Sequence, residues 1–269
     1  MMSRFEIIPL FSGSSGNSTL VVAGGKNILI DAGRNCKQIC TALSGTDIKP
    51  EDIDYVFVTH SHHDHTDAID VFRRKYKVPV YGTANTLYYI SRKSTKPHPD
   101  SDDIEIEEGE TVLLADDLAV KAISTPHDAP GSVCYKIVSG DRSVMIMTDL
   151  GYVTDEIIAD AYGCDVILIE ANYDQMMLVY GGYPEELKSR IAGRWGHLSN
   201  DACARAVFDL YEHGTRKFIL GHLSANNNTR EAAFETVTGF MKDEGLVEGR
   251  DYFIKVANRY DPTEGTVVS

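Results

Sequence analysis

The sequence lacks any apolar run near the roughly 20 residues that a membrane-spanning helix needs, so we expect no contact with a membrane. Its first residues, MMSRFEIIPL, contain no small-residue cleavage site after an apolar stretch. This argues against a secretory signal and predicts a cytoplasmic protein. The five cysteines are an odd number spread over 269 residues, which argues against a disulfide framework.

Positive charge is scarce, because 26 Lys and Arg residues stand against 40 Asp and Glu residues and leave a net charge of −14. A generally basic nucleic-acid-binding surface is therefore excluded, whereas a local basic groove is not. Bound divalent cations would offset part of the negative charge. No Pro- or Ser-rich linker divides the chain, and its length is ample for a sizeable core, so we predict one domain over residues 1–269.

Short apolar runs and helical patterns interleave along the chain. Many predicted strands form adjacent pairs joined by turn signals such as Gly24-Gly25, and the helices come singly between groups of strands. This order favours two packed sheets with helices outside over a simple alternation of strand and helix. The predicted strands are Phe5–Phe11, Thr19–Ala23, Asn27–Asp31, Tyr55–Thr59, Val78–Tyr81, Ile104–Ile106, Val112–Leu114, Ala119–Ser124, Val133–Val138, Ser143–Thr148, Asp165–Ile169, Lys217–Leu220 and Tyr252–Val256. The predicted helices are Cys36–Leu43, Asp67–Lys77, Ala84–Lys93, Asp155–Tyr162, Pro184–Ala192, Asn200–Glu212 and Thr229–Glu244.

The most informative motif is a cluster of histidines and one aspartate in a predicted loop directly after an apolar strand. His60 and His62 lie two residues apart and would project to the same side of an extended segment. Asp64 and His65 follow as a second pair. Imidazole and carboxylate groups suit zinc, iron and manganese. Because four such groups exceed what one structural zinc ion needs from one loop, we predict two neighbouring metal ions.

Three further candidate ligands follow predicted strands elsewhere: His127, Asp149 and His222. Alone, each is typical of a loop histidine or a turn residue. Together with the His60–His65 cluster, they place His and Asp side chains directly after four predicted strands. That pattern is expected for a two-metal hydrolytic site.

In their order and type these motifs resemble those of the metallo-β-lactamase superfamily, including Asp31 within Ile-Leu-Ile-Asp-Ala-Gly. The resemblance covers essentially the whole chain and implies an α/β fold, namely an αββα sandwich of two mixed β-sheets flanked by helices. It also implies that Asp149 bridges the two metals and that Asp31 orients the metal-binding segment. The implied ligands of the first metal are His60, His62 and His127. Those of the second metal are Asp64, His65 and His222.

Two other stretches resemble the YycJ (WalJ, VicX) group within this superfamily: Ser12–Ser18 and Gly182–Asn200. Asn172 and Asp174 also fit, whereas Tyr173 stands where that group would have a histidine. The phosphodiesterase PhnP and RNase Z are more distant look-alikes. The resemblance implies a metal-dependent phosphodiesterase or nuclease, with DNA exonuclease activity as proposed for YycJ-type members. The implied substrate is nucleic acid or a small phosphodiester.

The expected nucleophile is a metal-bridging hydroxide, because divalent ions lower the pKa of bound water to near 7. Asp64 would both bind metal and take the proton of the water. His197 lies outside the ligand set, before a predicted helix, and histidine suits acid catalysis near neutrality. We therefore predict that His197 binds no metal and either protonates the leaving oxygen or hydrogen-bonds the scissile phosphate. A capping or hydrogen-bonding histidine at the start of the helix is the alternative. Zinc is the first choice of metal, with manganese or iron as alternatives.

Other residues are candidates for contact with substrate. The Ser12–Ser18 loop can offer backbone N–H groups and hydroxyls to an anion, and the resemblance singles out Ser14 and Asn17 in it. Arg190 and Arg194 lie four residues apart on one helical face. A solvated face is the preferred interpretation of this pair, and contact with phosphates is the alternative. Of the remaining histidines, His63 is expected either to support the metal ligands or to face solvent, and His98 and His213 are expected at the surface.

Three other functions fit the same fold: hydrolysis of an acyl substrate by a thioesterase or lactamase-like enzyme, flavodiiron-like redox chemistry, and metal binding without catalysis. His197 and the lack of a secretory signal argue against a secreted lactamase. A flavodiiron-like site would carry a carboxylate in place of His62. Inactive relatives typically lose ligands, whereas this set is complete. The sequence leaves open the native substrate, the metal and the oligomeric state.

Overall fold

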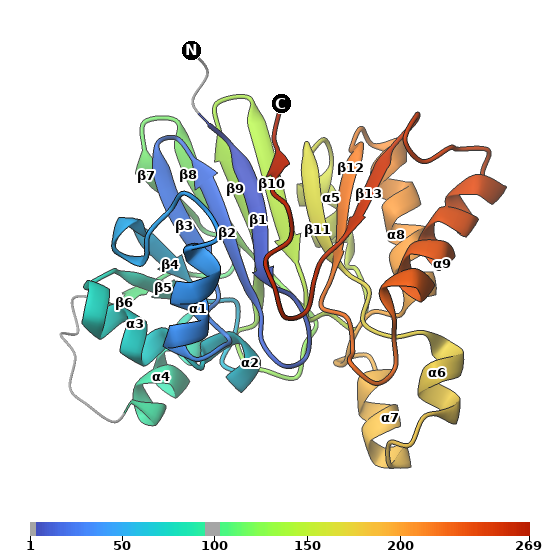
Figure 1. The fold of residues 1–269 in the computed structure, drawn as a ribbon, viewed down its shortest axis with the longest axis horizontal. Helices are drawn as coiled ribbons and strands as arrows, with labels where there is room; N and C mark the ends of the chain where they lie inside the picture. Colours follow the sequence, from blue (N-terminus) through green and yellow to red (C-terminus); the bar gives the residue numbers. More distant parts are fainter. Residues whose placement is uncertain (1–3, 95–102) are drawn as a thin grey trace.

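The computed structural model describes residues 4–94 and 103–269, and these residues form two seven-stranded β-sheets. The sheets face each other, and helices cover their outer faces (Figure 1). The predicted αββα sandwich is therefore confirmed. His98 lies outside the described residues. In the described part of the chain, no helix is long and apolar enough to cross a membrane.

The first sheet combines an antiparallel half and a parallel half. Its strands β1, β2 and β3 pair in antiparallel fashion, and β3 through β6 pair in parallel. In spatial order the strands are β14 (Thr266–Val267), β1 (Glu6–Phe11), β2 (Ser18–Ala23), β3 (Lys26–Ile30), β4 (Tyr55–Phe57), β5 (Val80–Gly82) and β6 (Asp103–Glu105).

The second sheet is mixed in the same way, with β7 to β10 antiparallel and β10 to β13 parallel. Strand β11 is buried at every position, because the sheet around it is covered on both faces. In spatial order the strands are β13 (Phe253–Val256), β12 (Lys217–Gly221), β11 (Val166–Glu170), β10 (Arg142–Met147), β9 (Val133–Ser139), β8 (Leu118–Ser124) and β7 (Thr111–Ala115).

Three apolar layers hold the sandwich together: one between the sheets and one under the helices on each outer face. Helices α1 (Cys36–Leu43), α3 (Ile69–Tyr76) and α4 (Ala84–Lys93) lie beside the first sheet. Helices α5 (Asp155–Ala161), α8 (Asn200–Glu212) and α9 (Arg230–Asp243) lie beside the second. The short helices α2 (His63–Thr66), α6 (Gln175–Tyr180) and α7 (Glu185–Ile191) lie near the lower edge in Figure 1.

Four short elements differ from the sequence-based prediction. The expected loop over the histidine cluster is wrong for its second half, since α2 begins at His63. Helix α6 was not predicted, although Asp174 caps its amino terminus by accepting a hydrogen bond from the Met177 N–H. Neither the 3₁₀ turn Pro50–Asp52 nor strand β14 was predicted. These elements are too short to show a helical or strand period, which is what the prediction relied on.

Candidate metal centre

All predicted metal ligands come together at the edge of the sandwich where the parallel strands end. The His60–His65 segment follows β4, His127 follows β8, and Asp149 and His222 follow β10 and β12. Strand β8 runs in the same direction as β10, because β9 between them is antiparallel to both. The carboxyl ends of strands that run in the same direction meet at one edge of a sheet, so residues far apart in sequence converge there.

Three residues at this edge have a left-handed backbone conformation: Asp31 with φ of 61°, Asp149 with φ of 60° and His222 with φ of 53°. Non-glycine residues rarely adopt this conformation, and they keep it only where the surrounding structure imposes it. Each of the three lies just beyond a strand, where it turns the chain sharply at the site. Strain of this kind is concentrated at functional sites.

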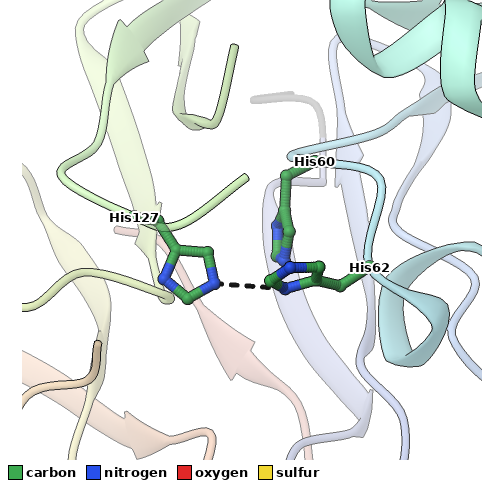
Figure 2. A group of neighbouring side chains, drawn as sticks. All are labelled: His60, His62 and His127. Atoms are coloured by element: carbon green, nitrogen blue, oxygen red, sulfur yellow. Dashed lines mark hydrogen bonds between the residues drawn. The ribbon is translucent and has the colours of Figure 1, made fainter. Parts of the chain in front are cut away.

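The first triad consists of His60, His62 and His127, whose ligand atoms all lie within 4.8 Å of one another. His127 Nε2 is 3.2 Å from His62 Nδ1, and Figure 2 shows the three rings converging. The Gly196 carbonyl oxygen accepts a hydrogen bond from His127 Nδ1 at 3.1 Å, which turns His127 Nε2 toward the other two rings. The three residues therefore form a nitrogen-lined site of the kind that holds a divalent ion.

The second triad consists of Asp64, His65 and His222. Asp64 Oδ2 is 3.6 Å from His65 Nε2 and 3.6 Å from His222 Nε2. Asp149 faces both triads, because its Oδ2 is 3.2 Å from His65 Nε2 and its Oδ1 is 3.7 Å from His127 Nε2. This position fits the predicted bridging role of Asp149.

Asp31 contacts the histidine cluster through His65 and Thr59, and its role in orienting the metal-binding segment stays a prediction. Its Oδ2 accepts a hydrogen bond from His65 Nδ1 at 2.7 Å and one from the Thr59 hydroxyl at 2.9 Å. The same hydroxyl lies 3.0 Å from His60 Nδ1. Because Nδ1 of each ring is engaged in this way, Nε2 of His60 and of His65 points into the site. A carboxylate that fixes ring orientation is typical around metal-binding histidines.

Several polar atoms at this site are buried without a hydrogen-bond partner: His60 Nε2, His222 Nε2 and Asp149 Oδ2. An unpartnered polar atom in the interior is costly, and a native structure contains few of them. Two imidazole nitrogens and a carboxylate oxygen would all be satisfied by a divalent cation. The residues of both triads therefore fit a metal-binding role.

A beta-lactamase superfamily domain model matches residues 26–223 of this chain. The chain belongs to the metallo-β-lactamase superfamily. It is 35% identical over 248 residues to the exodeoxyribonuclease WalJ of Streptococcus pneumoniae, which is 92% of each chain. It is 31% identical over 255 residues to the exodeoxyribonuclease YycJ of Bacillus anthracis, covering 95% of this chain and 96% of that one.

A solved structure of a diphosphatase from the PhnP family shares the metallo-β-lactamase fold. It superposes with a TM-score of 0.67 at 16% identity, over 100% of this chain and 99% of that chain. The domain model and the two curated relatives confirm both the superfamily assignment and the resemblance to the YycJ (WalJ) group.

Glu170 is a buried member of this metallo-β-lactamase site that the sequence analysis missed. Its Oε1 accepts hydrogen bonds from Nδ1 of His197 and from Nδ1 of His222, each at 2.8 Å. Its Oε2 accepts the backbone N–H groups of Leu150 and Leu198. Burial raises the pKa of Glu170, but His197 and His222 outweigh burial and lower it to about 2. A carboxylate that ends a wholly buried strand was the signal that could have revealed it.

His197 lies beside the triads, as the prediction of a catalytic role requires. Its ring centroid is 5.2 Å from that of His127 and 5.2 Å from that of His222. Its Nδ1 is also 3.7 Å from Asp149 Oδ1. Ser199 caps helix α8 by accepting a hydrogen bond from the Ala202 N–H, which fixes where the His197 segment ends.

The two predicted substrate contacts lie in different surroundings. Asn17 is buried, and its Nδ2 is 3.4 Å from Asp64 Oδ2 and 3.0 Å from His65 Nε2, so its amide reaches the second triad. Ser14 is exposed at the turn of the same loop. Contact of either residue with substrate stays a prediction.

The arginine pair on α7 and beyond it is engaged with other side chains. Arg190 Nε donates to Asp128 Oδ2 at 2.6 Å, and Asp128 Oδ1 lies 3.5 Å from His62 Nε2. Arg194 donates to the Tyr152 hydroxyl. The interpretation of the arginines as a simple solvated face is therefore incomplete, since each has a specific partner.

Tyr173 is buried against Leu178 and Ile191 rather than in the metal site.

The two triads differ electrostatically in the metal-free protein. Burial lowers the pKa of every histidine in the first triad, and neighbouring histidines lower it further in each case. Burial also opposes charge on His65 and His222, but Asp149 and the other nearby carboxylates outweigh it. They raise the pKa of His65 well above its usual value and that of His222 to about 10. Near pH 7 the first triad is therefore neutral and the second carries protons.

We expect metal binding to release protons at the second triad and not at the first. A metal ion must displace the protons on His65 and His222, so its affinity there should fall as the pH drops below their raised pKa values. Calorimetric titration of metal-free protein at pH 7, in buffers of different ionisation enthalpy, measures this release. Equal proton release for both ions would show that the two triads do not differ in this way.

Proposed function

We propose that this member of the metallo-β-lactamase superfamily is a metal-dependent exodeoxyribonuclease that hydrolyses the phosphodiester bonds of DNA in the cytoplasm. The observation that carries the proposal is the pair of triads joined by Asp149, with His197 held beside them by Glu170. The names of WalJ and YycJ, which align with more than nine-tenths of this chain, support DNA as the substrate.

The proposed cofactor is a pair of divalent ions, one at each triad, with Asp149 between them. Zinc is the first candidate, and manganese or iron would accept the same imidazole and carboxylate ligands. Such a pair, when bound, polarises phosphoryl oxygens and lowers the pKa of water to near 7, which predicts a neutral-to-alkaline pH optimum.

Asp64 is proposed to accept the proton of the attacking water in addition to binding metal. Its side chain is partly exposed, in contrast to the buried Asp149. Its carboxylate therefore combines contact with the second triad and access to solvent. Asn17 Nδ2, at 3.4 Å from Asp64 Oδ2, would hold that carboxylate in place.

His197 is proposed to protonate the leaving oxygen. Its Nδ1 donates to Glu170, so the opposite ring nitrogen, Nε2, is the one available to the substrate. The ionised Glu170 carboxylate orients the ring and compensates the charge of its protonated form, as in other carboxylate–histidine pairs of catalytic sites. Glu170 is a positioning residue in this account, because it acts through His197 and His222.

The proposed activity is tested with metal-loaded protein on linear DNA labelled at either end, with covalently closed circular DNA as a control. We expect stepwise release of nucleotides from the linear DNA only, complete loss of activity in excess chelator, and recovery when metal is restored. The same protein is assayed with an S-acyl glutathione and with nitrocefin. Turnover of either acyl substrate without any cleavage of DNA would overturn the proposal in favour of acyl hydrolysis.

A further inference from the structure

The guanidinium group of Arg194 lies against two aromatic rings, those of Tyr152 and Trp195, and we call these three residues the Arg194 stack. Arg194 Cζ is 4.9 Å from the centroid of the Tyr152 ring and 5.9 Å from that of the Trp195 ring. Arg194 Nη2 also donates to the Tyr152 hydroxyl at 2.8 Å. Trp195 is nevertheless 56% exposed, which is unusual for a tryptophan and leaves much of its indole open to a ligand.

The Arg194 stack is carried by the same two loops that carry catalytic groups. Trp195 precedes Gly196, whose carbonyl oxygen accepts the hydrogen bond from His127 Nδ1, and it lies two residues before His197. Tyr152 lies three residues after Asp149. The loops are in tight contact, since a Cβ atom added to Gly151 would lie 2.2 Å from the Arg194 carbonyl oxygen. The stack is therefore fixed relative to the metal centre.

None of the three apolar layers of the sandwich includes Trp195, so packing of the core does not account for it. An exposed indole next to a guanidinium group is the combination on which bases of single-stranded nucleic acids stack. The chain has a net charge of −14 and would on the whole repel a polyanion such as DNA. It therefore needs a local basic and aromatic site of this kind to bind one.

We infer that Trp195, supported by Arg194 and Tyr152, forms a subsite that binds an unpaired base of the DNA substrate next to the scissile phosphodiester. This inference rests on the proposed nuclease function and adds a specificity-determining residue to it. The base stacks on the indole, and the adjacent phosphate comes to lie at the metal centre. The chain has one tryptophan, so its fluorescence reports on this subsite alone.

The inference is tested first by fluorescence. Metal-loaded protein is titrated with a single-stranded oligonucleotide whose phosphorothioate linkages slow its hydrolysis, and with the same oligonucleotide carrying abasic residues at its ends. We expect the base-bearing oligonucleotide to quench Trp195 and the abasic one to leave it unchanged. Equal quenching by both would overturn the inference. So would a fluorescence change that depends on protein concentration without DNA, because it would assign Trp195 to a contact between two copies of the chain.

Kinetics provides the second test. Trp195→Ala should raise KM for single-stranded DNA roughly tenfold or more, the effect of losing one base–aromatic stack, with little change in kcat. The metal content of the purified variant should equal that of the wild type, which shows that the metal centre is intact. Phe253→Ala is the matched control, because Phe253 is 51% exposed on β13 and pairs with Lys217 at the start of β12, whereas His222 follows the end of β12. An unchanged KM for DNA in an active Trp195→Ala enzyme would defeat the subsite alone, whereas absence of any DNA cleavage by the wild type would defeat the proposed function.

Discussion

Asp149→Asn is expected to reduce turnover to the level of a chelated control and to lower the metal content of the purified protein. Asp149 is buried between the triads, and its carboxylate faces His65 on one side and His127 on the other. Burial raises its pKa, but His222 and His65 outweigh burial and hold the pKa well below the usual value, so the group is ionised at neutral pH. The neutral amide would remove the one negative charge shared by both metal positions.

Asparagine is the better substitution here because it tolerates the left-handed backbone at this position, where alanine adds strain of about 1–2 kcal/mol. Breaking a buried charge pair costs about 3–5 kcal/mol, so the thermal stability of the metal-free variant should be measured alongside its activity. Asp160→Asn is the matched control, because it removes one carboxylate that pairs with Lys121 on the outer side of the sheet. Wild-type turnover by Asp149→Asn would show that Asp149 does not bridge the metals.

His197→Ala should keep full metal content and lose at least about a hundredfold in turnover of DNA, since a general acid is typically worth 10²–10⁴-fold. The loss should be much smaller with a nitrophenyl phosphodiester, because nitrophenolate departs without needing a proton. The reason is structural. Glu170 Oε1 accepts a hydrogen bond from His197 Nδ1 at 2.8 Å, so Nε2 is the ring nitrogen that can protonate the leaving group.

Metal analysis of the same variant separates three roles for His197. Its Nδ1, together with Glu170, Asp149 and His222, belongs to a group of ligand atoms within 4.8 Å of one another, so loss of metal would make His197 a ligand. Equal losses on both substrates would indicate phosphate binding, and no loss would leave it with a structural role only. His213→Ala is the control, because His213 lies at the end of α8, stacked on Tyr162.

Much of the fold could be predicted because its long elements have clear periodicity. Helices α1, α4 and α8 begin and end where the sequence patterns placed them, and each is capped at its start by Asn35, Thr83 or Ser199. Strand β14 could not be predicted, because two terminal residues show no period and only their pairing with β1 defines a strand.

The candidate metal ligands could be predicted because they are histidines and aspartates that directly follow apolar strands. Polar side chains at these positions stand out from the apolar residues before them. Glu170 also ends a strand but was missed, because its role depends on two histidines from segments 27 and 52 residues away, which donate hydrogen bonds to its carboxylate only in the folded chain. Tertiary contacts of this kind are absent from any local pattern. The same reason hid the Arg194 stack, whose Tyr152 comes from a different loop.

Helices α6 and α7 lie between Glu170 and His197 in the sequence, and their apolar side chains pack against one another. The apolar residues of this segment form a small cluster of their own, made of Tyr173, Leu178 and Ile191 with Tyr183 and Leu187 packed against them. This cluster is separate from the three apolar layers of the sandwich. Changes in the length or sequence of this segment can reshape the surface next to the metals, while the strands that carry the ligands stay as they are. Exchange of residues 175–191 for those of a relative is therefore expected to change the choice of substrate while the metal content stays that of the wild type.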